Sequence, residues 1–107
     1  MKNREVAEKF ANGDSYGKGS NLYFIGNHIY SYGSHFPIAI RLRTSHIFKY
    51  VWNTDKYSVS TSKHQNYVLN AIGKNNIILK VNTKRIIDLA GGEAETVKEL
   101  VAIGVMK

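Results

Sequence analysis

The chain has 107 residues, of which 43% are hydrophobic and 21% are charged, as expected of one folded domain rather than a disordered segment. It contains no cysteine, which excludes a disulfide scaffold, a thiolate zinc site and a cysteine nucleophile. No apolar run approaches the roughly 20 residues that cross a bilayer, and the first residues lack the apolar core of a secretory signal. We therefore expect a single domain over residues 1–107, located in the cytoplasm and not in a membrane.

The net charge of +7 is concentrated in the middle of the chain. Residues 16–87 contain ten lysines and arginines against Asp55 alone, a net charge of +9, whereas residues 1–14 are neutral and residues 88–107 are acidic. A basic centre between neutral and acidic ends indicates a partner rich in phosphate or carboxylate. The alternative is a solubilising charge with no partner.

The first part of the chain predicts a helix followed by a hairpin. Apolar residues fall on one face of a helix over residues 4–12, and a polar, glycine-rich loop follows over residues 14–20. Residues 21–25 and 28–32 predict two strands around the two-residue turn Gly26-Asn27. In the register that this turn favours, the two residue numbers of every cross-strand pair add up to 53.

That register gives the hairpin two different faces. One face is apolar and should lie in the core; it carries Leu22, Phe24, Ile29 and Ser31. The other is unusually aromatic for a face in contact with solvent; it carries Tyr23, Ile25, His28, Tyr30 and Tyr32. We expect Tyr23, Tyr30 and Tyr32 to stack bases. The alternative is that a helix covers them, with their hydroxyl groups at its rim.

The rest of the chain predicts four more strands and three helices. The strands are expected over residues 38–42, 47–52, 57–59 and 77–81, and the helices over residues 63–72, 83–89 and 93–103. The first of these helices should begin with a capping box, Ser62-Lys63-His64-Gln65, and end at Gly73. This order of elements predicts an α+β fold: a mostly antiparallel sheet of five or six strands, with two or three helices packed against one face.

Several residues could bind phosphate. Helix N-termini bind anions, so Ser60, Thr61, Ser62 and Lys63 form a candidate phosphate site, although their hydroxyls could simply cap the helix. Basic residues elsewhere would meet further phosphates; these are Arg41, Arg43, Lys49, Lys56 and Arg85. The segment Gly17-Lys18-Gly19-Ser20 lacks the glycine spacing of a nucleotide-binding P-loop.

Enzyme chemistry has one candidate arrangement. None of the four histidines has metal-ligand spacing, and we expect no metal or cofactor. His35 and His64 could act as a metal-free acid and base on a phosphodiester. The alternative is that both histidines are structural.

Two stretches resemble small uncharacterised domains encoded by bacteriophages and related mobile elements. They are residues 30–39, YSYGSHFPIA, and residues 57–65, YSVSTSKHQ. The resemblance covers about residues 5–72. It implies a viral accessory protein in the bacterial host cell, and it implies no activity.

Taken together, these features favour a small accessory protein that binds a nucleic acid or a nucleotide and acts against host defence. One alternative is a metal-independent nuclease or phosphodiesterase that uses His35 and His64. Another is an inhibitor that binds a host nucleic-acid-binding enzyme, which would require an exposed apolar patch. The sequence does not indicate the oligomeric state.

Overall fold

A computed structural model describes residues 1–33, 36–43, 48–56 and 58–89. In chain order its elements are α1 (Asn3–Ala11), β1 (Tyr16–Lys18), β2 (Leu22–Ile25), β3 (His28–Ser31), β4 (Pro37–Arg43), β5 (Phe48–Asn53), α2 (Val59–Ile72), η1 (Lys74–Asn76), β6 (Ile77–Val81) and α3 (Thr83–Leu89). The helix expected over residues 93–103 lies outside the described residues.

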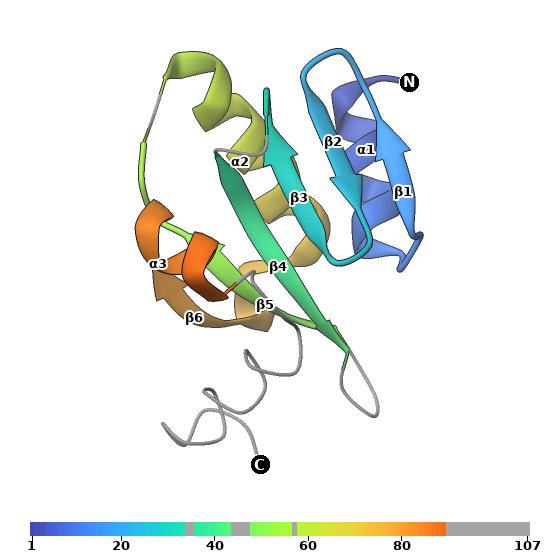
Figure 1. Ribbon diagram of the computed structural model, residues 1–107. Helices are drawn as coiled ribbons and strands as arrows, with labels where there is room; N and C mark the ends of the chain where they lie inside the picture. Colours follow the sequence, from blue (N-terminus) through green and yellow to red (C-terminus); the bar gives the residue numbers. More distant parts are fainter. Residues whose placement is uncertain (34–35, 44–47, 57, 90–107) are drawn as a thin grey trace.

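The six strands form one sheet in the order β1-β2-β3-β4-β5-β6. The first five follow one another as antiparallel neighbours, and β6 pairs in parallel with β5 after the chain has crossed through α2 (Figure 1). The α+β class and the mostly antiparallel sheet are thereby confirmed.

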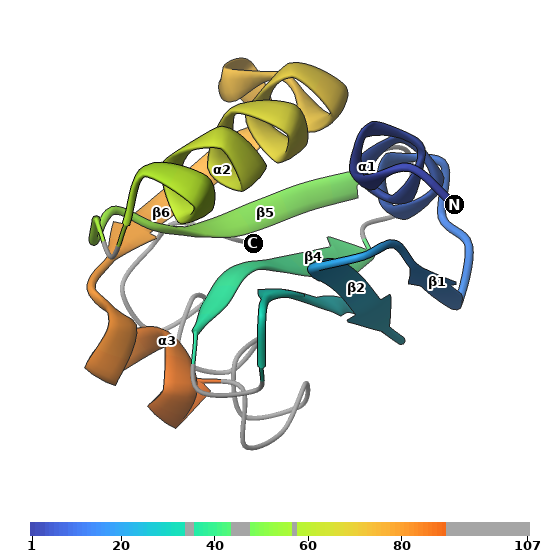
Figure 2. The ribbon, with the colours of Figure 1, turned by 90° about the horizontal axis from the view of Figure 1, so that it is seen from above.

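The helices lie on both faces of this sheet rather than on one. α1 and α2 lie side by side on one face, and α3 lies on the other (Figure 2). Two separate apolar clusters account for this arrangement. Side chains of α1 and α2 share the larger cluster with β2–β5, whereas Ile86 and Leu89 of α3 pack with Ile40, Leu42 and Val51.

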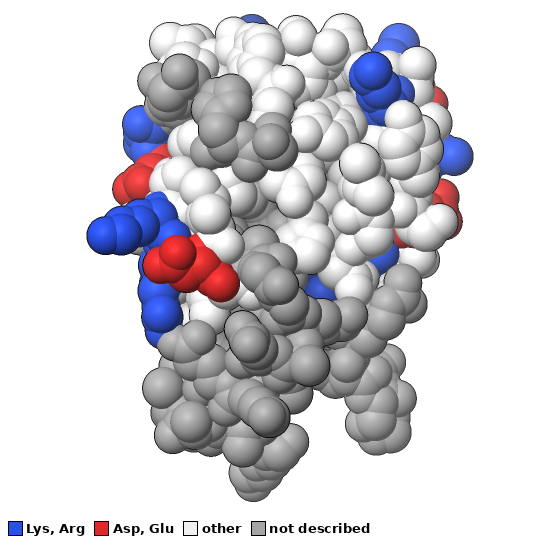
Figure 3. All heavy atoms as spheres, in the orientation of Figure 1, with Lys and Arg blue, Asp and Glu red and all other residues white. Residues whose placement is uncertain are grey.

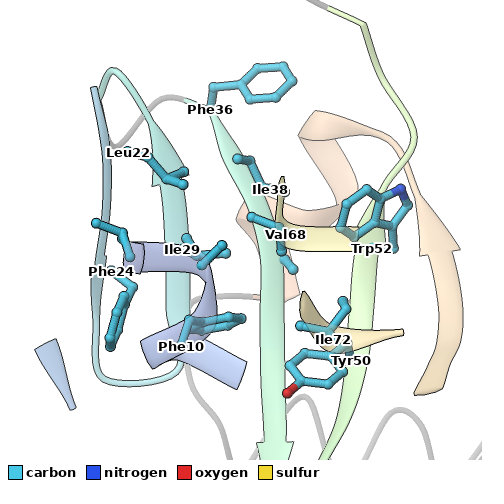
Figure 4. Close-up of a cluster of buried hydrophobic side chains, with 13 residues drawn as sticks. Phe10, Leu22, Phe24, Ile29, Phe36, Ile38, Tyr50, Trp52, Val68 and Ile72 are labelled. Atoms are coloured by element: carbon cyan, nitrogen blue, oxygen red, sulfur yellow. The ribbon is translucent and has the colours of Figure 1, made fainter. Parts of the chain in front are cut away.

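The larger cluster contains the face of the hairpin that the sequence assigns to the core (Figure 4). Phe10 of α1 packs edge-on against Phe24, with ring centroids 5.4 Å apart. Leu22, Phe24 and Ile29 are fully buried. The hairpin pairs Leu22 with Ser31 and Ile25 with His28, so the predicted register is confirmed.

The predicted loop over residues 14–20 contains a strand, β1, which the sequence analysis missed. β1 pairs with β2 and forms one edge of the sheet. Its central residue is Gly17, and a Cβ atom there would lie 2.5 Å from the ring of Phe24. The strand therefore needs a glycine, and the glycine removed the alternating pattern by which a strand is recognised.

The start of α2 was also predicted wrongly. The helix begins at Val59, and its N-cap is Ser58, whose hydroxyl accepts a hydrogen bond from the backbone N–H of Thr61 at 3.1 Å. Val59 therefore belongs to the helix and not to the strand expected over residues 57–59. Ser62 lies inside the helix, and Gln65 uses its amide group elsewhere: it donates to the carbonyl groups of Asn53 and Asp55.

Candidate functional site

The most distinctive surface of the molecule is the outer face of β1, β2 and β3. Cross-strand pairing arranges its side chains in two rows, Tyr30–Tyr23–Lys18 and His28–Ile25–Tyr16. We call these six residues the tyrosine face. His28 also pairs with Ile40, which packs beneath α3, so the tyrosine face lies on the α3 side of the sheet.

No described helix covers the tyrosine face. α3 packs over β4 and β5, while α1 and α2 cover the opposite side of the sheet. Tyr16 and Ile25 are each 58% exposed. Among the described residues, the expected alternative of a covering helix is therefore not realised.

The aromatic rings of the tyrosine face stand in a column. Tyr23 and Tyr30 stack with ring centroids 5.2 Å apart and an angle of 26° between their planes. His28, two residues before Tyr30 on the same strand, also stacks with Tyr30, at 6.4 Å and 25°, and we call these three rings the aromatic column. Partial burial, followed by the nearby Tyr23 hydroxyl, raises the pKa of Tyr30 above its ordinary value. Tyr30 is therefore a neutral ring at physiological pH.

Charge is sparse over the centre of this face. Figure 3 views the molecule from this side, with Lys and Arg gathered at the edges and uncharged atoms between them. Lys18 is the basic residue within the tyrosine face, at the end of one row. It forms no salt bridge with any carboxylate of the described residues.

A groove of about 260 Å³ lies at the β1 end of the tyrosine face. Its walls come from β1, from β2, from the loop between them and from the residue after β3; they are Tyr16, Lys18, Gly19, Ser20, Asn21, Leu22, Tyr23, Ile25 and Tyr32. The groove is therefore bordered by three tyrosines and one lysine.

Tyr32 lies at the end of the hairpin rather than in the column. Its backbone has a φ of 67°, a left-handed conformation that residues with a side chain seldom adopt. Its ring, half exposed, rests against His64, with centroids 5.5 Å apart. Of the three expected stacking residues, Tyr23 and Tyr30 therefore stack on each other, and Tyr32 lines the groove.

His64 is buried between the sheet and α1. Its Nδ1 lies 2.7 Å from the Ser31 hydroxyl, and its Nε2 lies 3.4 Å from Nδ2 of Asn3. The Ser31 hydroxyl also lies 3.3 Å from the Thr61 hydroxyl. The structure thus brings together residues from the two separate stretches 30–39 and 57–65.

This burial argues against a direct catalytic role for His64. Only 4% of its surface is exposed, and both of its ring nitrogens face protein groups. Burial also lowers its pKa below the ordinary value of 6.5. His35, the other member of the expected pair, lies outside the described residues, so the distance between the two histidines is not defined.

Arg41 is not exposed for phosphate binding, contrary to the sequence-based expectation. Its guanidinium is fully buried and donates to the backbone carbonyls of Phe10, Asp14 and Gly26 and to the side chain of Asn27. The physical cause is a register shift between β3 and β4, which changes the face to which the later residues of β4 point.

The other expected phosphate contacts lie on several elements rather than on one surface. Lys49 is half-buried on β5, Lys56 is exposed before α2, and Arg85 is exposed on α3. Arg43 ends β4, and its side chain lies outside the described part. The basic residues that the sequence singled out therefore do not form a single patch with the tyrosine face.

The first turn of α2 does not present four polar groups together. Thr61 is buried and bonded to Ser31, whereas Ser60 and Lys63 are exposed and Ser62 is half-buried. The Ser58 hydroxyl already accepts the hydrogen bond of one first-turn N–H group. Capping therefore explains the Ser58 hydroxyl and packing explains the Thr61 hydroxyl.

Two further hollows lie along α1 and α2, on the opposite side of the sheet. They share Arg4 and Tyr67, and the guanidinium carbon of Arg4 lies 5.7 Å from the centre of the Tyr67 ring. Glu8 lines one hollow and Lys2 the other. The hollow beside Glu8 is mixed in charge, whereas the hollow beside Lys2 is lined by two cations, Lys2 and Arg4. Neither hollow is lined by the stacked rings of the tyrosine face.

The described residues contain no cluster of three or more His, Asp or Glu side chains placed to hold a metal ion. Within the same residues, no helix has the length and apolar character needed to cross a membrane. Comparison of the chain with protein-family models, with curated proteins and with solved structures gives no match.

Sequence reasoning missed three residues of the candidate site: Tyr16, Asn21 and, as a site residue, Lys18. Tyr16 and Lys18 belong to β1, which was assigned to a loop, whereas Asn21 was placed in the predicted strand over residues 21–25 and lies in the structure just before β2. The available signal was a tyrosine and a lysine two residues apart, on either side of a glycine, just before the predicted hairpin.

Proposed function

We propose that this protein binds single-stranded nucleic acid, or a nucleotide, on its tyrosine face. One observation carries the proposal: the column of Tyr23, Tyr30 and His28 stands on a sheet face that the described helices leave uncovered. Bases stack on aromatic side chains whatever their sequence, because every base has a π-face.

The arrangement of charge favours a single strand over a duplex. A duplex hides the faces of its bases and is held mainly by contacts between its phosphates and basic residues. The tyrosine face offers rings and one lysine, Lys18, rather than a broad basic surface. Stacking therefore supplies the contact energy, and the net charge of +7 assists the approach of the ligand.

Fluorescence anisotropy with a labelled single-stranded oligonucleotide tests this proposal. Replacing both stacked tyrosines, Tyr23→Leu with Tyr30→Leu, should weaken binding by roughly tenfold or more, since each base–ring stack contributes about 1–3 kcal/mol. The matched control is Tyr67→Leu on α2, which lies on the opposite side of the sheet and should leave the affinity unchanged.

The same assay should give an affinity that falls as salt rises, with a shallow slope that reflects few phosphate contacts. A duplex of the same sequence should bind more weakly. If the double tyrosine variant bound as tightly as the unmodified protein, or if no oligonucleotide bound at micromolar concentration in low salt, the proposal would be wrong.

A further inference from the structure

The groove lies where the aromatic column ends. It is lined by Tyr23 and not by Tyr30, so it lies on the side of Tyr23 away from Tyr30. Tyr23 therefore presents one ring face to Tyr30 and borders the groove on its other side. A planar group in the groove would continue the column by one member.

The other walls of the groove differ in character from the column. Lys18 pairs across the strands with Tyr23 and lines the groove, so its side chain adjoins the planar group's position. Ile25 and Tyr16 contribute apolar surface next to it. The groove therefore combines a stacking wall, an apolar wall and one positive charge.

Polar groups capable of base recognition come from the loop between β1 and β2. The backbone of Asn21 is fixed on both sides: its carbonyl accepts from Tyr32 N–H at 2.7 Å, and its N–H donates to Asn3 Oδ1 at 3.4 Å. Its carboxamide makes no hydrogen bond to the described residues and carries both donors and an acceptor. Such a group can pair with the edge of a base.

We propose that this groove binds a single unpaired nucleobase with its 5′-phosphate, stacked on Tyr23, with the phosphate at Lys18 and the base edge at Asn21. The inference rests on the proposed function and gives it a defined ligand: one nucleotide, either free or at an unstacked position of a strand. Asn21 is then the residue that distinguishes one base from another.

The size of the groove supports one nucleotide rather than two. Its volume of about 260 Å³ lies just below the range of roughly 300–1,000 Å³ that is typical of sites for drug-sized ligands. A second base would have to leave the groove, either along the column or into solvent. The site therefore suits a mononucleotide unit.

Calorimetric titration with the four nucleoside 5′-monophosphates tests this inference, with ribose 5-phosphate as the ligand that lacks a base. Nucleotides should bind saturably, and ribose 5-phosphate should bind at least about tenfold more weakly, because it cannot stack. Lys18→Gln should weaken all four nucleotides by roughly three- to tenfold through loss of one charge-assisted contact.

Asn21→Ala should change the order of preference among the four bases while leaving the folded structure intact. The matched controls are Lys63→Gln and Asn66→Ala on α2. They remove an ammonium group and a carboxamide that lie outside the groove, so they should alter neither the affinity for nucleotides nor the order of preference among bases. Equal binding of ribose 5-phosphate and the nucleotides would contradict a base site. An unchanged order of preference in Asn21→Ala would remove the role of Asn21.

Failure of this inference is separable from failure of the proposed function. If single-stranded oligonucleotides bind and depend on Tyr23 and Tyr30, while mononucleotides at millimolar concentration do not bind, the tyrosine face is a strand-binding surface and the groove site is wrong. If neither ligand binds, both proposals are wrong.

Discussion

Arg41 is a buried cation that joins three separate parts of the chain. Its guanidinium donates to Phe10 at the end of α1, to Asp14 in the following turn and to Gly26 in the hairpin turn. The guanidinium carbon also lies 4.9 Å from the centre of the Phe10 ring. The carbonyl end of a helix is its negative end, so a cation beside Phe10 is well placed.

Arg41→Lys should therefore destabilise the protein, although it preserves the charge. The lysine ammonium group cannot reproduce the several fixed N–H donors of the planar guanidinium. Buried carbonyl groups would therefore lose their hydrogen bonds, which costs free energy. We expect the free energy of unfolding to fall by at least about 2 kcal/mol, measured by urea denaturation. The opposite exchange at an exposed position, Lys63→Arg on α2, should change it by no more than about 0.5 kcal/mol. Equal effects of the two variants would show that the buried guanidinium of Arg41 does not contribute to stability through its geometry.

His64 gives the protein a pH-dependent stability. Asn3 presents its Nδ2 to Nε2 of His64, an arrangement that suits a neutral ring whose Nε2 accepts and whose Nδ1 donates to Ser31. Burial lowers the pKa of His64 below 6.5. When the pH falls through 6.5, the unfolded chain takes up a proton that the folded chain does not, so the folded state loses stability.

The free energy of unfolding should accordingly decrease as the pH is lowered from about 7 to about 5. His64→Gln should reduce the slope of this decrease, whatever its effect on stability at pH 7. Asn66→Ala on the exposed surface of α2 removes no titratable group, so it serves as the control and should leave the slope in place. Chemical denaturation at a series of pH values measures this slope. An unchanged slope in His64→Gln would contradict the role of His64.

At the scale of elements, α2 shows how a cap decides where a helix begins. The sequence offers two polar starts four residues apart, Ser58 and Ser62. A capping box at Ser62 would need the side chain of Gln65. Gln65 instead donates to the carbonyl groups of Asn53, at the end of β5, and Asp55, so the helix begins after Ser58. Those carbonyls are long-range partners, which local spacing does not reveal.

Ser58→Ala should lower the free energy of unfolding by about 0.5–2 kcal/mol, through loss of the hydrogen bond to the Thr61 N–H. Ser62→Ala is the matched comparison, because Ser62 lies within the helix, where alanine is favourable. It should be neutral or slightly stabilising. Thermal unfolding of both variants decides between the two starts: a larger loss in Ser62→Ala would restore the start that the sequence favoured.

The elements also show what the sequence could and could not predict. The hairpin was predictable because Gly26, with a φ of 58°, forms the tight turn and because apolar residues alternate on both sides of it. β1 was not, since its central Gly17 is required by the ring of Phe24. The inward position of Arg41 follows from a register shift, which alternation alone does not reveal.

At the scale of the whole molecule, the aromatic surface and most of the exposed basic residues lie in different places. The tyrosine face occupies one half of one side of the sheet, and α3 covers the other half. The exposed basic residues Lys56, Lys63 and Arg85 lie outside the tyrosine face. We infer that the net charge increases the rate at which an anionic strand approaches, while the aromatic column sets how tightly it is held.

The position of the ligand is the central claim, and mapping amide and aromatic chemical shifts by NMR during titration with a short single-stranded oligonucleotide tests it most directly. The largest shifts should fall on the tyrosine face, above all at Tyr23, Tyr30 and Lys18. Residues of α1 and α2 that face away from the sheet, such as Glu8 and Asn70, should not move. Shifts concentrated on α1 and α2 would place the ligand on the opposite side of the sheet and contradict this account.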